Sequence, residues 1–147
     1  RKATPHIHCT VFSPDGKYIF ATDFSADRIL RFVMHPDDPI PHASLEAVDI
    51  EADSGPRHLT FSPNGKFAYL ITELSGKVIA FSYDDGCLEQ IQTITADTVA
   101  ARGSADIHLS PDGKYLYAST GLLEDTHQDI VVDMPVCVQF VSSVNNL

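Results

Sequence analysis

Basic side chains are scarce in this sequence of 147 residues. It has 10 Lys and Arg against 20 Asp and Glu, which gives a formal net charge of −10. Surfaces that bind nucleic acid or anionic membranes need clustered Lys and Arg, so the composition argues against both partners. No apolar run approaches the ~20 residues that a membrane helix needs. No signal peptide is visible at the start, and we expect a cytoplasmic protein.

Paired cysteines and known catalytic motifs are also missing. The three cysteines, Cys9, Cys87 and Cys137, form no Cys-x-x-Cys pair, which favours free thiols over a zinc or dithiol site. His6 and His8 share one face of a predicted strand, but no third metal ligand follows at a matching spacing. No nucleophile elbow, phosphate loop or catalytic-triad pattern is present. The sequence therefore predicts neither a metal nor a cofactor.

An internal repeat is the clearest feature that the sequence does contain. A Ser-Pro-Asp/Asn-Gly-Lys-aromatic motif begins at Ser13, Ser62 and Ser110, so it recurs after 49 and then 48 residues. This period is typical of one four-stranded propeller blade. In each copy an apolar run reaches Ser-Pro, the Asp-Gly or Asn-Gly step supplies a tight turn, and an aromatic-rich run returns. The repeat predicts an all-β fold, a partial β-propeller of about three four-stranded antiparallel blades.

The repeat also predicts where the strands lie. In the first copy they span residues 9–12, 18–24, 29–34 and 45–50, and in the second 58–61, 67–74, 77–83 and 88–94. The third copy gives only 106–109 and 115–119. Three prolines predict a surface loop over 35–42, because proline cannot donate to a strand ladder. Residues 96–102 are expected to form a loop between blades.

The last part of the chain departs from the repeat. Residues 124–128 are polar where the third strand of a third blade should begin. We therefore divide the chain into a partial propeller over 1–121 and a divergent tail over 122–147. A frameshifted reading frame is one hypothesis for this tail.

Matched positions of the repeat place three polar residues together. Each copy has an apolar residue directly before Ser-Pro, and the residue four positions before it is His8, Arg57 or Ala105 in the three copies. The residue at the end of the second strand is Phe24, Glu73 or Gly121. Because these two strands are antiparallel, both sets lie at one end of each blade. The first strand of a blade lines the central channel, so His8, Arg57 and Glu73 should meet at its mouth. A base, a cation and a carboxylate there suggest a hydrolytic site.

Each of these three residues also has a purely structural interpretation. His8 could be a hydrogen-bonded histidine without a catalytic role. Arg57 could pair with Glu73 simply to offset the cost of burying a carboxylate. A separation within about 6 Å, the range at which charges shift each other's pKa, would favour a site.

Several motifs together resemble those of a known family. They are Pro5-His6-Ile7-His8, the block Ser-Gly-Pro-Arg-His-Leu-Thr-Phe over 54–61, Glu73-Leu74, and Ala-Asp-Ile-His-Leu-Ser-Pro-Asp-Gly over 105–113. Over residues 3–120 the chain is similar to the lactonase family of seven-bladed β-propellers, which includes 6-phosphogluconolactonases and carboxy-cis,cis-muconate cyclases. The resemblance implies a cofactor-independent site in which His8, Arg57 and Glu73 match active-site positions. A further family arginine is expected where this chain has Gly121.

The resemblance implies hydrolysis of a small, anionic sugar lactone, with 6-phosphogluconolactone as the first candidate. Arg57 would bind the substrate or polarise its carbonyl, and either His8 or Glu73 would act as general base. A muconate cyclase or lactonising reaction is the enzymatic alternative, and a non-catalytic propeller that binds ligand or protein is the other. Since three repeats leave sheet edges open, we expect this chain alone to self-associate and to be inactive.

Overall fold

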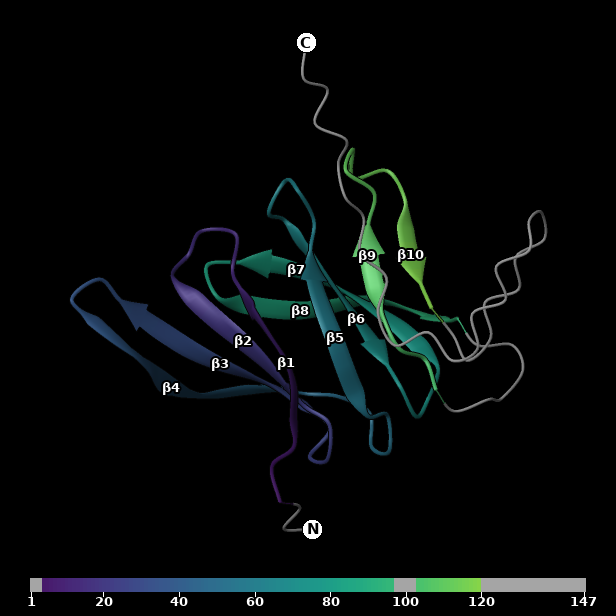
Figure 1. Cartoon of the computed structure of the whole chain (residues 1–147), viewed down its shortest axis with the longest axis horizontal. Helices are drawn as coiled ribbons and strands as arrows, with labels where there is room; N and C mark the ends of the chain where they lie inside the picture. The colour runs from purple at the N-terminus through teal and green to yellow at the C-terminus, as the bar shows by residue number, and fades with distance from the viewer. Residues whose placement is uncertain (1–3, 97–102, 120–147) are drawn as a thin grey trace.

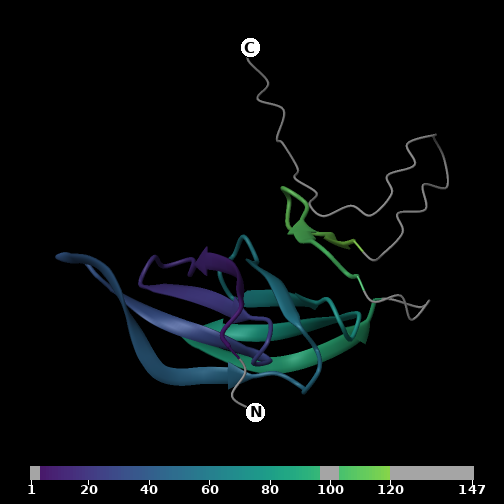
Figure 2. The ribbon, with the colours of Figure 1, turned by 60° about the horizontal axis from the view of Figure 1, so that its bottom comes forward.

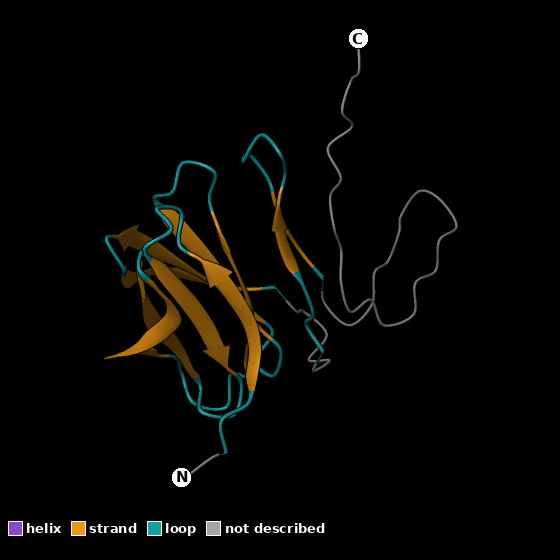
Figure 3. Ribbon diagram, turned by 60° about the vertical axis from the view of Figure 1, so that its left-hand side comes forward, coloured by secondary structure: helices purple, strands orange, loops and turns teal. Residues whose placement is uncertain are grey.

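Strands make up all the regular structure in the described part of the chain. The computed structural model describes residues 4–96 and 103–119, with only the backbone described over 38–46, and no helix occurs in these ranges (Figure 3). None of them therefore contains a helix that could cross a membrane. The strands are β1 (Ile7–Phe12), β2 (Tyr18–Asp23), β3 (Arg28–His35), β4 (Asp38–Asp49), β5 (Pro56–Phe61), β6 (Phe67–Thr72), β7 (Lys77–Asp84), β8 (Cys87–Thr95), β9 (Ile107–Leu109) and β10 (Leu116–Ala118).

The strands form three antiparallel meanders that follow one another along the chain. Two sheets have four strands, in the orders β1-β2-β3-β4 and β5-β6-β7-β8, and β9 pairs with β10 as a hairpin. In Figure 1 the first sheet lies on the left, the second in the middle and the hairpin on the right. The innermost strands contact one another in sequence, β1 against β5 and β5 against β9. This arrangement confirms the predicted fold class, a partial β-propeller.

The predicted loop over 35–42 is wrong. Strand β4 already begins at Asp38 and pairs with β3 as far as His35, so only Pro36 and Asp37 lie outside the two strands. The register shifts between Val33 and His35, and the remaining two prolines fall in that shifted stretch. Strand β4 is also the edge of its sheet. Proline is tolerated at edges and irregularities because its missing N–H group has no ladder partner there.

The repeated turns share one hydrogen-bond network. In the first turn Ser13 Oγ donates to Asp15 Oδ1 over 2.5 Å and accepts the N–H of Tyr18 over 2.9 Å. Asp15 Oδ1 also accepts the N–H of Lys17 over 3.1 Å. The turns that begin at Ser62 and Ser110 repeat all three bonds. An arrangement that is the same in every copy is explained by turn formation alone.

Apolar side chains join the blades. The core between the two complete sheets contains seven residues that are at most 3% exposed, namely Phe20, Ile29, Leu59, Ala68, Leu70, Ile79 and Phe81. Ile71 follows Leu70 in β6 and points to the opposite face, where it packs with Val78 and Ile107 of the third repeat. The stacked sheets are seen nearly edge-on in Figure 2. Strand β6 is therefore buried on both faces, as a strand between two neighbouring blades must be.

Two predictions fall on residues outside the described ranges. One is the predicted loop between blades over 96–102, of which only Ala96 is described. The other is the divergent tail over 122–147, with the preceding Gly121. Both remain predictions.

Candidate active site

His8 is the extra residue of a β-bulge in strand β1. Ile7 pairs with Asp23 of β2, and Cys9 pairs with the adjacent Thr22, so no residue of β2 lies opposite His8. A bulge bends the strand locally and redirects the side chain of the extra residue.

Arg57 occupies the equivalent bulge of the second blade. Pro56 pairs with Thr72 of β6 and His58 pairs with Ile71, which leaves Arg57 without a residue opposite. His8 and Arg57 thus combine the same position in the repeat with the same local distortion. The distortion breaks strict alternation of side chains, so that Arg57 and the adjacent His58 both lie beside His8.

A buried threonine connects the two bulges. Thr22 is 0% exposed, and its Oγ1 atom donates to the carbonyl oxygen of Arg57 over 2.6 Å. The same atom accepts the N–H of Cys9, the residue after His8, over 3.1 Å. One hydroxyl group therefore satisfies backbone groups at both irregular positions.

We expect Thr22→Val to destabilise the chain by about 1–3 kcal/mol, because a buried donor and a buried acceptor lose their partner while the shape is kept. Urea unfolding followed by tyrosine fluorescence would measure the loss. Thr10→Val, at an exposed position of β1, is the matched control and should change stability little. Equal effects of the two substitutions would show that the hydroxyl group does not stabilise the bulges.

The three residues selected from the sequence meet in the structure. Arg57 Nε lies 3.1 Å from His8 Nε2 and 2.9 Å from Glu73 Oε2. Glu73 directly follows β6, and its N–H group donates to the carbonyl oxygen of Gly55 over 2.8 Å. The Arg57 side chain is 12% exposed and that of Glu73 is 31% exposed. The arginine is thus largely buried between a histidine and a carboxylate, well inside the predicted 6 Å.

The contact with Arg57 indicates the tautomer of His8. The Nε–H group of arginine can only donate, so His8 Nε2 must be the unprotonated nitrogen and Nδ1 must carry the proton. His8 Nδ1 and Arg57 Nη1 are both buried and have no hydrogen-bond partner among the described residues. Buried donors without acceptors are costly, so their presence suggests a place for an electronegative ligand atom.

Burial lowers the pKa of His8, and the neighbouring Arg57 guanidinium and His58 lower it further, against an opposite effect of Glu73. Neutral His8 is therefore the favoured form of the folded protein near neutral pH. The unfolded chain binds a proton here near pH 6.5 but the folded chain does so only at lower pH. The contribution of His8 to stability should therefore fall as the pH drops through 6.5.

A histidine titration followed by NMR would test this. We expect the midpoint for His8 to lie below 6.5, to rise in Arg57→Gln and to fall further in Glu73→Gln. The two substitutions remove opposite charges, so each is the control for the other. Shifts of the same sign in both variants would contradict the prediction.

A second polar cluster, which the sequence analysis did not select, lies beside His8. Asp106 is 3% exposed, and its Oδ1 atom lies 2.5 Å from His58 Nδ1 and accepts the N–H of Ile107 over 2.9 Å. Its Oδ2 atom lies 3.0 Å from His108 Nε2. The rings of His58 and His8 are 5.1 Å apart between centroids and meet edge to face.

The repeat contained a signal for this cluster. Cys9, His58 and Asp106 occupy one matched position in the three copies, one residue after the position of His8 and Arg57. In a regular strand this position would point to the opposite face. Side-chain alternation therefore argues against placing His58 and Asp106 in the same site as Arg57, unless the bulges are known.

Comparison with known proteins decides the family. The model of the family described as lactonase, 7-bladed beta-propeller, matches residues 1–120. The chain belongs to this lactonase family. A protein of Formosa agariphila named 6-phosphogluconolactonase is 41% identical over 120 residues, which cover 79% of this chain and 34% of that relative. The chain thus spans about a third of the length of the curated relatives it matches.

Solved structures of similar proteins agree with the fold of this lactonase-family chain. A candidate 6-phosphogluconolactonase of Bacteroides uniformis is 68% identical with a TM-score of 0.81, and the match covers 96% of this chain and 59% of that one. The periplasmic gluconolactonase of Pseudomonas aeruginosa is 39% identical with a TM-score of 0.72, over 78% of this chain and 33% of that one.

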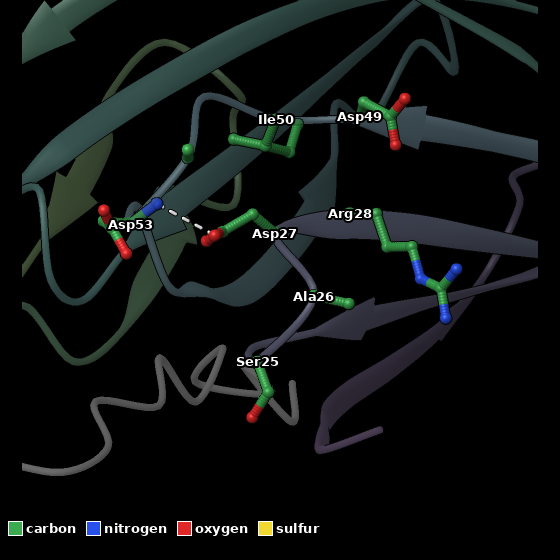
Figure 4. A pocket seen from close by; sticks show the side chains of 8 residues that line it. Ser25, Ala26, Asp27, Arg28, Asp49, Ile50 and Asp53 are labelled. Carbon is green, nitrogen blue, oxygen red and sulfur yellow. Dashed lines mark hydrogen bonds between the residues drawn. The ribbon is translucent and has the colours of Figure 1, made fainter. Parts of the chain in front are cut away.

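A separate hollow of this propeller lies where β2 turns into β3 and has a structural explanation. It has a volume of about 470 Å³ and is lined by residues 25–28, 49, 50, 52 and 53. Figure 4 shows the Asp27 carboxylate pointing towards the backbone of Asp53. That carboxylate accepts the N–H groups of Asp53, Ser54 and Gly55 over 2.8–3.0 Å. It thereby holds the segment that leads into Arg57.

The described residues contain no group of side chains that could bind a metal ion. Within the ranges that the structure describes, no three side chains of His, Cys, Asp or Glu are grouped so that they could hold an ion. His8, one member of the sequence-selected histidine pair, directs its Nε2 atom at Arg57.

Proposed function

We propose that this member of the lactonase family hydrolyses sugar-acid lactones, with 6-phosphogluconolactone as the first substrate. The proposal rests on two neighbouring buried atoms, His8 Nδ1 and Arg57 Nη1, which have no hydrogen-bond partner in the described part of the chain. Two donors without acceptors suit the carbonyl oxygen of a lactone, which gains negative charge when water attacks. The names of the relatives from Formosa and Pseudomonas support a lactone as substrate.

Charge and protonation of the two donors fit this role. Arg57 supplies a positively charged guanidinium, and the Glu73 carboxylate lies 2.9 Å from its Nε atom, which leaves Nη1 for the substrate. The lowered pKa of His8 keeps the ring neutral, and a neutral imidazole can donate a hydrogen bond to a developing oxyanion without carrying charge itself. On this interpretation His8 is a donor rather than the general base.

The negative charge of the substrate also has a candidate partner. The chain carries a net charge of −10, so an anionic lactone meets an unfavourable overall field. A guanidinium that is only 12% exposed can outweigh that field locally, because buried charges are screened little by water and salt.

A chimera tests the function in a closed ring. Residues 4–119 would replace the homologous segment of the Bacteroides uniformis protein, whose 68% identity favours correct packing against its other blades. We expect the folded, monomeric chimera to hydrolyse 6-phosphogluconolactone faster than buffer does. A panel with gluconolactone and carboxy-cis,cis-muconate separates a sugar lactonase from a cyclase. No turnover of any lactone would contradict the proposal.

The 147-residue chain alone is the comparison in this assay. Its exposed apolar side chains include Phe12, Ile91 and Ile94, which are 54–64% exposed. Open sheet edges and such side chains favour association, so we expect oligomers and no lactone hydrolysis above the buffer rate. Cytoplasmic location also remains a prediction, since the Pseudomonas neighbour is named periplasmic.

A further inference from the structure

Lactone hydrolysis needs a group that takes a proton from water, and neither sequence-selected candidate is well placed for it. The one lone pair of neutral His8, on Nε2, faces the Nε–H of Arg57 over 3.1 Å. The Oε2 atom of Glu73 lies 2.9 Å from the same guanidinium. That oxygen is therefore already held in an ion pair.

His58 has the geometry that these two residues lack. A carboxylate can only accept, so the 2.5 Å contact with Asp106 places the proton of a neutral His58 on Nδ1. The lone pair then lies on Nε2, for which no described residue provides a hydrogen bond. The His58 side chain is 23% exposed, so water can reach it.

Asp106 is held firmly enough to orient the ring. It is 3% exposed, its Oδ1 atom also accepts the N–H of Ile107, and its backbone N–H donates to Ser119 Oγ over 2.8 Å. His108 donates from Nε2 to the other carboxylate oxygen over 3.0 Å, so this nitrogen is already used. A base whose far nitrogen is fixed by a buried carboxylate is the arrangement that activates nucleophiles in many hydrolases.

We propose that His58 is the general base of the lactonase-family site and that Asp106 is its positioning residue. This inference rests on the proposed function. His58 stands next to Arg57 in β5, and its ring is 5.1 Å from that of His8, so the base lies beside the two donors.

His58 alone can both take up and return the proton that is transferred during lactone hydrolysis. Nε2 takes a proton from water while the water oxygen bonds to the lactone carbonyl carbon, and the oxyanion forms against the donors of Arg57 and His8. The ring C–O bond then breaks, and the protonated His58 returns the proton to the leaving alkoxide. The product is the hydroxy acid, and His58 is neutral again.

The tautomer can be measured on the folded, monomeric chimera without any assay of activity. Long-range ¹H–¹⁵N correlation of the ring should show a protonated Nδ1 and an unprotonated Nε2 for His58. A proton on Nε2 instead would overturn the assignment, since that nitrogen would then have no lone pair.

The kinetic test uses the chimera. His58→Asn keeps an amide donor where Nδ1 stood but has no counterpart of Nε2, so kcat should fall by at least about 100-fold while KM changes little. Asp106→Asn should lower kcat in the same way, because it removes the charge that stabilises protonated His58. His6→Asn replaces an exposed histidine and is the matched control, with kcat unchanged.

The outcomes separate this inference from the proposed function. If the folded wild-type chimera hydrolyses no lactone, the proposed function fails, and the inference fails with it. If the wild type is active and His58→Asn keeps its kcat, only the assignment of the base is overturned. Recovery of activity in His58→Ala by added imidazole would support it, because a purely structural role would not be restored by a free base.

Discussion

Replacing Arg57 by alanine in the chimera should lower kcat/KM for 6-phosphogluconolactone by at least about 100-fold, or about 2.7 kcal/mol of transition-state stabilisation. The guanidinium is 12% exposed, and its Nη1 atom is buried without a hydrogen-bond partner among the described residues. Its loss removes the fixed positive charge opposite the developing oxyanion. Initial rates over a range of substrate concentrations would measure the effect.

Glu73→Ala should lower kcat/KM by a similar factor. The carboxylate lies 2.9 Å from Arg57 Nε, so the substitution removes both the charge partner and the group that fixes the orientation of the arginine. Because such a group acts through Arg57, the double variant should lose little more than either single one. Additive losses would indicate that Glu73 has a separate role.

Arg31→Ala is the matched control for these substitutions. Arg31 lies in β3, stacks over the ring of Tyr18 and donates to the carbonyl oxygen of Gly86, and neither of these contacts involves a residue of the site. We expect its kcat/KM to stay close to that of the wild type. Full activity of both Arg57→Ala and Glu73→Ala would refute the assigned site.

Gly55→Ala should destabilise the folded chimera by about 2–5 kcal/mol. Gly55 has φ of +64°, where an L side chain is strained by about 1–2 kcal/mol. A Cβ atom would also lie 2.8 Å from Leu74 Cγ and 2.9 Å from Phe24 Cε2, and overpacking of this kind typically costs about 1–3 kcal/mol. The free energy of unfolding in urea would measure the sum.

Gly16→Ala separates the two contributions. Gly16 has φ of +71°, but no atom lies within 4 Å of its Cβ position, so only the backbone strain of about 1–2 kcal/mol should remain. A loss as large as that of Gly55→Ala would contradict the packing argument. Since Gly55 is two residues before Arg57, its substitution should also reduce lactone hydrolysis in the chimera.

The sequence was sufficient to predict the blades. A tight turn needs Asp-Gly or Asn-Gly at a fixed distance from apolar runs, so the motifs at Ser13, Ser62 and Ser110 locate the hairpins. The same period places His8 beside Arg57, because matched residues of neighbouring blades lie at the same height along the channel. Glu73 joins them because antiparallel strands bring the end of one to the start of the next.

Only the tertiary structure determines which hydrogen bonds and ion pairs the site residues form. Strand alternation assigns Arg57 and His58 to opposite faces, and only the bulge that Thr22 stabilises from the neighbouring blade brings both beside His8. The pairing of His58 with Asp106 joins residues 48 positions apart on different blades. A period predicts which positions are equivalent, but a bulge depends on hydrogen bonds between blades, and no local pattern in the sequence encodes them.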